Sequence, residues 1–232
     1  MWRQKEVAMS STAEGFRRAR SAAAKSQREG DILAAARRLA AEGGVRSVTL
    51  TDIAAEIGMH KSALLRYYET REQIFLVLAG QAWREWSAAL RLRLQAVAQH
   101  DAAAVAGLLA ETLVARPVFC DLLAHVPLHL ERNVSVEQLR VFKLVALDEV
   151  GAICAVLGPL LGLEREQAIG IVSTATSMAG ALWQMATPDE PVRRLYRAEP
   201  RLSHAIIDVE ARLRETLLAL IVGYVTLSGR DG

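Results

Sequence analysis

Three adjacent polar residues, His60, Lys61 and Ser62, stand at the expected start of a short helix, where they could contact the bases of DNA. A lysine ammonium group can donate to O6 or N7 of guanine, and Arg66, further along the same helix, could reach a base edge or a phosphate. A helix that served only for packing would not require three polar residues at its start. The pattern therefore favours recognition of double-stranded DNA by this segment.

The residues before and after this cluster predict two short helices joined by a tight turn. Thr49 and Asp52 form a capping box, a hydroxyl at the helix start and a carboxylate three residues later. The apolar residues of the first helix have the spacing of one buried face: Leu50, Ile53, Ala54 and Ile57. Gly58 can adopt the positive φ that ends such a helix. Two helices joined in this way form a helix-turn-helix, whose second helix presents its N-terminal residues to base edges.

One more helix precedes the motif and another follows it. A capping box at Ser26–Glu29 opens a helix that stops near Gly43, and a second box at Thr70–Gln73 opens the helix after the motif. We therefore predict a three-helix DNA-binding domain over residues 26–75. Residues 1–25 lack sustained periodicity and are expected to be disordered. Their basic side chains could reach a minor groove or form only a solvated tail.

The charge distribution agrees with DNA contact at one end of the chain. The first 75 residues contain 13 Lys and Arg against 9 Asp and Glu, whereas the remainder contains 15 against 17. A basic head on a mildly acidic body fits a protein that touches DNA through the head alone.

Beyond the motif the apolar spacing predicts only helices, so the expected fold class is all-α with about nine helices. They should span residues 71–99, 101–116, 117–125, 135–157, 164–186 and 204–227, with a loop marked by Pro188, Pro191 and Pro200.

The stretch from Gly30 to Leu78 resembles the DNA-binding motif of the TetR family of transcriptional regulators. The resemblance rests on the Thr49–Asp52 start, the glycine turn and the polar start of the second helix. It implies a set of DNA contacts: Thr49, Thr51, His60, Lys61, Ser62, Leu65, Arg66, Tyr67 and Arg71. In this family Thr49 and Thr51 would hold the DNA backbone, while Tyr67 and Arg71 would bind phosphates.

Two residues depart from the family pattern. Leu65 stands where a tyrosine is usual, which replaces a hydroxyl contact with an apolar surface suited to a thymine methyl group. His60 stands where serine is common, so the cap of the second helix should be weaker. Both changes make the operator sequence harder to infer.

The resemblance also implies that residues 76–232 form an effector-binding and dimerisation domain. Because its central helices carry large apolar side chains and few charges, we expect an apolar or amphipathic effector, with two histidines as polar contacts. The candidate pocket residues are Trp83, Trp86, Phe119, His125, His129, Phe142 and Met178.

The predicted dimer interface is a four-helix bundle made by residues 164–186 and 204–227 of each subunit. The first of these helices is apolar nearly all round and needs partners on both sides, and small residues such as Gly170 and Gly180 would allow close approach. A two-fold axis makes such a patch self-complementary. The residues expected there are Ile171, Ala175, Met178, Leu182, Leu213, Leu217, Ile221 and Tyr224.

Other chemistry receives little support. Cys120 and Cys154 are too few for a disulfide framework or a cysteine zinc site. Residues 168–188 carry no charge and could span a bilayer by length, but their hydroxyl and amide side chains favour a buried or interface helix. There is no N-terminal signal-peptide pattern, no G-x-S-x-G motif and no phosphate-binding glycine loop. We expect no cofactor, no membrane contact and a cytoplasmic location.

The sequence therefore predicts a ligand-responsive transcriptional regulator, not an enzyme, that acts as a homodimer on a palindromic operator and is released by its effector. Two alternatives remain open. One is a helical enzyme or metal-binding protein with a DNA-binding head, since His125 and His129 lie four residues apart, although Pro127 between them disturbs a helical metal site. The other is a DNA-binding protein without an effector.

Overall fold

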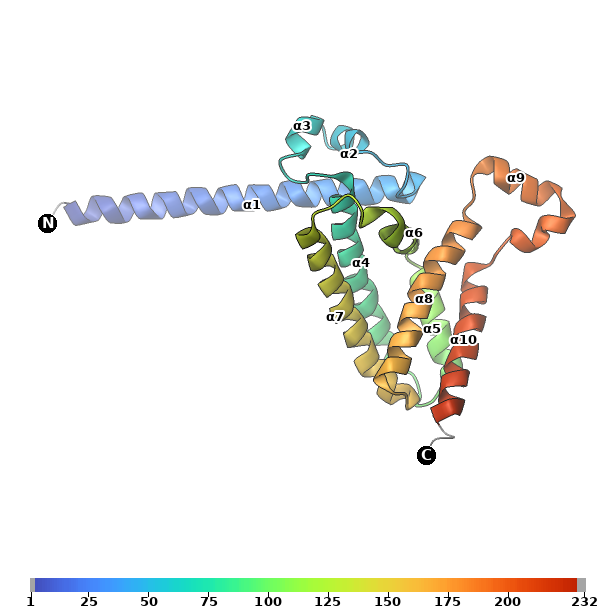
Figure 1. Ribbon diagram of the computed structural model, residues 1–232. Coiled ribbons are helices and arrows are strands. Elements are labelled where there is room, and N and C mark those ends of the chain that lie inside the picture. The colour runs from blue at the N-terminus through green and yellow to red at the C-terminus, as the bar shows by residue number, and fades with distance from the viewer. Residues whose placement is uncertain (1–2, 229–232) are drawn as a thin grey trace.

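The computed structural model describes residues 3–228, with the side chains of residues 23–202 and 205–228, and contains helices and turns but no strand within that range. The predicted all-α fold class is confirmed. Figure 1 shows a small head, in which α1 (Arg3–Gly43) carries α2 (Leu50–Glu56) and α3 (Lys61–Leu64), above a larger helical body.

The body contains seven more α-helices and two short irregular helices. In chain order they are α4 (Arg71–Leu94), α5 (Ala102–Val114), α6 (Pro117–His125), the π-helix η1 (Val126–Leu130), α7 (Val136–Leu161), α8 (Arg165–Ala186), α9 (Glu190–Ala198), the 3-10 helix η2 (Pro200–Ala205) and α10 (Val209–Ser228). The main packing pairs are α4 with α7, α5 with α10, and α6 with α8.

The head is held together by the apolar stripes that the sequence predicts. Ile32 of α1, Ile53 of α2 and Leu64 of α3 are fully buried, and they belong to the same core. Gly58 adopts φ 65° in the turn between α2 and α3, as expected for the glycine that ends the first helix of the motif.

The beginning of α1 differs from the expected disordered arm. The helix is continuous from Arg3, so Ser26 lies inside it instead of capping its start, and the N-terminal part projects away from the rest of the molecule (Figure 1). Residues 3–25 contain no proline and are rich in Ala, Arg, Lys and Glu. These residues have high helix propensity, which lets the helix extend without tertiary support.

Caps fix several helix starts in the body. Ser135 and Gln138 form a reciprocal capping box at the start of α7, and Asp101 accepts a hydrogen bond from the amide of Ala104. At α4, the Thr70 hydroxyl accepts a hydrogen bond from the backbone amide of Gln73. The side-chain oxygen of Gln73 does not accept from the amide of Thr70 in return, but from that of Glu69. The predicted box at Thr70 is therefore only half formed.

Prolines break the body helices less than the sequence suggests. The chain continues through Pro127 as η1, and α7 runs past Pro159 to end at Gly162, where φ is 69°. Residues 190–198, expected to be a loop, form α9, because Pro191 lies in the first turn, where a missing N–H costs no helical hydrogen bond.

Among the described residues one single helix, α7, is long and apolar enough to cross a membrane by length and composition, with a mean hydropathy of 1.9 over a window that is 28% buried. The segments Ala102–Val114 and Pro117–Leu130 pass the same test only together, and they are bent by 87°. Helix α7 packs on α4 and α8 inside the folded body. The uncharged stretch of residues 168–188 corresponds mainly to α8, which packs against α6, α7 and α10.

Candidate DNA-binding surface and ligand cavities

The start of α2 has the predicted capping geometry. The carboxylate of Asp52 accepts from the amide of Thr49 at 2.8 Å and from its hydroxyl at 2.7 Å, and the amide of Asp52 donates to Thr49 Oγ1 at 3.2 Å. These hydrogen bonds lower the pKa of Asp52 below its ordinary value. Thr49 therefore holds the end of the helix while its side chain stays exposed.

The second helix of the motif is short. α3 spans Lys61–Leu64, and turn hydrogen bonds continue it as far as Tyr68, whose amide donates to the carbonyl of Leu64 at 3.2 Å. His60 occupies the N-cap without a side-chain hydrogen bond, as its weak capping ability predicts. Leu64 and Tyr68 are buried, which anchors the segment and turns its remaining side chains outward.

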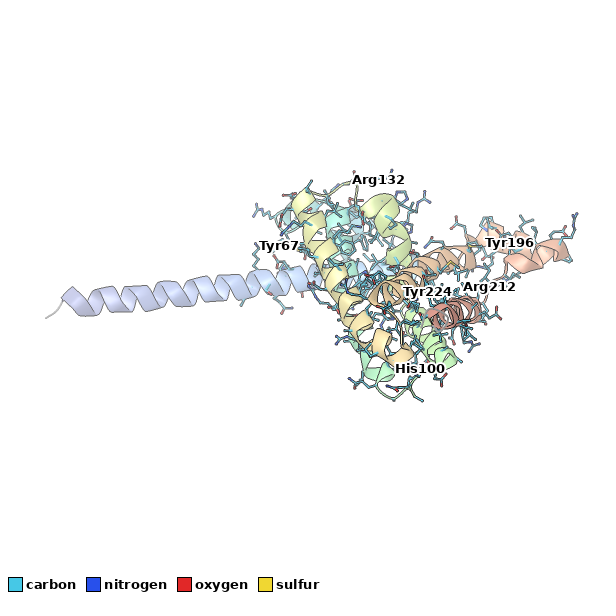
Figure 2. The ribbon with its side chains drawn as sticks, turned by 60° about the horizontal axis from the view of Figure 1, so that its bottom comes forward. Tyr67, His100, Arg132, Tyr196, Arg212 and Tyr224 are labelled. Atoms are coloured by element: carbon cyan, nitrogen blue, oxygen red, sulfur yellow. The ribbon has the colours of Figure 1, made fainter. Side chains whose placement is uncertain are left out.

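The outward residues form a polar surface without internal partners. None of their side chains makes a hydrogen bond or ion pair with any other described residue; they are Thr51, His60, Lys61, Ser62, Arg66 and Tyr67. Leu65, which is 43% exposed, adds an apolar contact to the same surface. Tyr67 lies at the edge of the folded part, on the side from which α1 projects (Figure 2). We call this set, together with Leu65 and Thr49, the recognition surface.

Arg71 differs from the recognition surface. Its guanidinium group donates to the carbonyl oxygens of Val45 and Val48 and, at 3.1 Å, to the carboxylate of Glu72. It also lies over the ring of Phe75, 4.7 Å from the ring centroid. These contacts join the start of α4 to the loop before α2, so this arginine has an internal structural role that the resemblance did not imply.

Comparisons with known proteins agree with this geometry. Residues 32–78 match the family model of bacterial regulatory proteins of the tetR family, and residues 80–226 match the tetracyclin repressor-like C-terminal domain. The chain belongs to the TetR family. Regulators of this family bind operator DNA and act as dimers, and they are generally transcription factors without catalytic activity.

Solved TetR-family structures share the fold. The fatty acid degradation regulator FadR from Bacillus halodurans is 16% identical, with a TM-score of 0.54 over 84% of this chain and 94% of that chain. FadR from Thermus thermophilus, a transcriptional repressor solved in complex with lauroyl-CoA, is 18% identical, with a TM-score of 0.54 over 84% and 93% of the two chains. No curated protein sequence matches the chain significantly.

The regulator has an apolar cavity of about 230 Å³ in the body, between α4, α6, α7 and α8. Three of the predicted pocket residues line it, namely Trp83, Phe119 and Phe142. Trp86 lies behind them, with its ring 5.5 Å from that of Trp83, and donates its indole N–H to Thr112 at 3.0 Å. We call this space the body cavity.

The polar groups of the body cavity are not the predicted histidines. His129 is exposed and His125 lines a different cavity, while Met178 is not part of this lining. Instead Glu131 and Lys143 line it, with 2.5 Å between Lys143 Nζ and Glu131 Oε1. This carboxylate oxygen is buried, and the angle of its contact with the ammonium group is not that of a hydrogen bond. No periodic pattern in the sequence marks this pair.

A second cavity, of about 590 Å³, lies where the head meets the body. It is bounded by the end of α1 and the loop after it, by α6, by the end of α8 and by the start of α9. We call it the junction cavity. No sequence pattern marks this cavity, because it forms only when four segments far apart in the chain come together.

Asp121 of α6 connects three of these segments. Its carboxylate accepts from the backbone amide of Val45 in the head at 2.6 Å and from the side chain of Gln184 in α8 at 2.6 Å. His125, one turn later, places Nε2 3.3 Å from the same carboxylate. Burial alone would raise the pKa of Asp121, but the hydrogen bonds from His125, Val45 and Gln184 outweigh burial and lower it. Asp121 is therefore an ionised, buried link between head and body.

The predicted dimer-interface residues occupy a different place. Six of them are buried inside the subunit with at most 6% of their surface exposed: Ile171, Ala175, Leu182, Leu213, Leu217 and Ile221. Tyr224 packs over Gly170 of the same subunit, since a Cβ at that glycine would lie 2.7 Å from the tyrosine hydroxyl. Met178 is half-buried. The apolar stripe on which the prediction rested is the stripe that α8 and α10 use to pack within one subunit.

His125 and His129 do not form a metal site with other ligands. Their ring centroids lie 5.8 Å apart, and no group of three or more His, Cys, Asp or Glu side chains suited to a metal occurs within the described residues. Cys120 and Cys154 are both buried free thiols.

Proposed function

We propose that this TetR-family regulator is a repressor that binds a palindromic operator as a homodimer and is released by a small apolar or amphipathic effector. The recognition surface carries this proposal, because it presents several exposed polar side chains that have no partner among the described residues. Hydrogen-bond donors of this kind at the start of the second helix suit base edges and phosphates. Two such helices, one from each subunit, would enter the major groove about one helical turn apart.

The body cavity is the proposed effector site. Its walls are aromatic and aliphatic, and Glu131 with Lys143 supplies one charged end. An apolar molecule with one polar group would match both parts. T. thermophilus FadR was solved with lauroyl-CoA, which supports the general idea of an amphipathic ligand without naming one for this protein. The effector must bind one arrangement of head and body more tightly than the other in order to release DNA.

The proposed dimer interface uses the outer faces of α8 and α10, opposite the stripes that are buried in the subunit. The exposed residues on these faces are Ser173, Ser177, Ala181 and Met185 on α8, and Ala219, Val222, Gly223 and Thr226 on α10. Most are small, which allows helices of two subunits to approach closely, and two copies of each helix form a four-helix bundle. The proposed interface thus uses the same two helices that the sequence predicts, but the residues on their opposite faces.

Footprinting of the purified protein on DNA around its own gene tests DNA binding, and a thermal-shift screen of uncharged lipophilic compounds tests the effector class. We expect Ala146→Leu to fill part of the body cavity and to reduce the thermal shift of any compound found. Ala152→Leu, on the same helix but outside the cavity lining, should leave that shift unchanged. A screen that yields only highly charged ligands would refute the proposed effector class.

A further inference from the structure

The junction cavity has features of a ligand site that are separate from the proposed effector site. Its volume of about 590 Å³ exceeds the 230 Å³ of the body cavity, and its walls come from both the head and the body. The indole ring of Trp183 and the side chains of Pro117 and Val118 supply apolar surface, while charged side chains supply the rest. A molecule held here would touch both parts of the protein at once.

His125 offers an unused hydrogen-bond acceptor at this cavity. Asp121 is ionised and can only accept hydrogen bonds, so the ring nitrogen that faces it, Nε2 at 3.3 Å, must carry the proton. In a neutral imidazole the other nitrogen, Nδ1, is then an acceptor. Nδ1 has no hydrogen-bond partner within the described part of the chain, although the residue is only 8% exposed and lines the cavity. A ligand that meets this nitrogen should therefore be a donor.

The charged lining has an excess of carboxylates. Four acidic residues line the cavity, Glu42, Asp121, Asp189 and Glu190, against the two arginines Arg46 and Arg193. Arg193 is bonded to Glu190 at 3.2 Å, and Asp121 is satisfied by its three partners. The carboxylates of Glu42 and Asp189 form no hydrogen bond or ion pair with other described residues, and neither does Arg46. A net negative wall of this kind attracts cations and repels anions.

We propose that the junction cavity binds a small organic cation, an ammonium group on an apolar body. The ammonium group donates to His125 Nδ1 and lies near the carboxylates of Glu42 and Asp189. The apolar body packs against Trp183, whose ring face also attracts a cation. Because Glu42 belongs to α1 and Asp189 immediately precedes α9, the bound cation bridges head and body.

Three probes of one shape test the ligand class on the full-length protein. Benzylamine, benzyl alcohol and benzoate differ mainly in charge, and their dissociation constants can be measured by NMR titration. We expect benzylamine to bind most tightly and benzoate most weakly. The side-chain indole signal of Trp183 should shift with benzylamine, and that of Trp83 in the body cavity should not.

Conservative variants locate the charges. We expect Glu42→Gln and Asp189→Asn each to weaken benzylamine binding by up to about fivefold, as partly exposed ion pairs do. Glu166→Gln makes the same charge change at the exposed start of α8, outside the cavity lining, and should have no effect. The proposal is overturned if benzoate binds as tightly as benzylamine, if benzylamine does not bind, if it shifts Trp83 instead of Trp183, or if all three variants behave alike.

Discussion

On the recognition surface most polar side chains are exposed, and those other than Thr49 hold no partner among the described residues. Asp121, at the junction of head and body, is instead buried and fully bonded. Free polar groups on a rigid, well-capped element are available to a ligand, here DNA. Buried polar groups that satisfy one another hold two parts of the fold in a fixed relation. The same residue types thus serve recognition in one region and coupling in the other.

Arg71 shows why this distinction must be made residue by residue. The family resemblance places it among the DNA contacts, yet its guanidinium group is bonded to two carbonyl oxygens and to Glu72. Its side chain is 19% exposed, whereas the side chains of the recognition surface are exposed, apart from the half-buried Tyr67. We therefore expect Arg71 to act on DNA binding chiefly by fixing the loop before α2.

The largest expected effect comes from a charge placed inside the body. Leu217→Asp removes a fully buried side chain and buries a carboxylate without a partner. The expected loss in the free energy of unfolding exceeds about 4 kcal/mol, so the variant should be unfolded or insoluble. Urea denaturation followed by circular dichroism measures this loss.

A matched substitution two residues later separates the core from the dimer interface. Ala219 is exposed on the outer face of the same helix, so Ala219→Asp should stay folded but dissociate the dimer, which sedimentation velocity detects. A folded dimer for Ala219→Asp would contradict the proposed interface. If Leu217→Asp instead forms folded monomers, the result would support the interface that the sequence predicts.

The next effect concerns the junction. Asp121→Ala leaves the amide of Val45, Gln184 and His125 without their shared acceptor, and we expect the free energy of unfolding to fall by about 2–3 kcal/mol. Asp121→Asn, which keeps an acceptor oxygen, should lose less. Equal losses in both variants would show that the charge, not the acceptor, is what matters at this position.

The difference in the free energy of unfolding between the parent and Asp121→Ala should depend on pH in a definite direction. The pKa of Asp121 is lower in the folded protein than its ordinary value of 3.8. Its carboxylate therefore contributes stability above about pH 3.8, and this contribution is lost as pH falls through the folded pKa. Stability curves of the parent and of Asp121→Ala should converge in strong acid, and a gap that widens there would contradict the assignment.

A smaller effect is expected on the recognition surface. Tyr67→Phe removes a hydroxyl that bonds to no other described residue, so the fold should keep its stability. If the hydroxyl binds a phosphate, operator and non-operator DNA should both bind more weakly, by about 1 kcal/mol. Fluorescence anisotropy with the two DNAs measures both losses, and a loss confined to the operator would instead make Tyr67 a base contact.

The head was predictable because its signals are local. The Thr49–Asp52 capping box and the glycine turn are each encoded within a few residues, and the structure has them where the sequence places them. Helix ends near prolines were less predictable. Pro127 is tolerated in the π-helix η1, and Pro191 is tolerated in the first turn of α9.

The body was predictable in its helices but not in its sites. Periodicity identifies an apolar stripe, yet it does not tell whether the partner belongs to the same subunit or to another. For this reason the sequence predicts Leu217 and Ile221 at the dimer interface, although they lie in the subunit core. The Asp121 link and both cavities depend on contacts between distant segments, for which a single sequence has no signal.

One titration tests whether the second helix of the head reads DNA. Operator DNA identified by footprinting and a panel with single base changes are titrated with the parent, with Lys61→Ala and with the control Arg132→Ala, which removes an exposed charge from the body (Figure 2). We expect Lys61→Ala to lose about 1–3 kcal/mol on the operator and to discriminate less at one base position, while Arg132→Ala binds like the parent. Binding of Lys61→Ala with parental affinity and parental sequence preference would contradict this expectation.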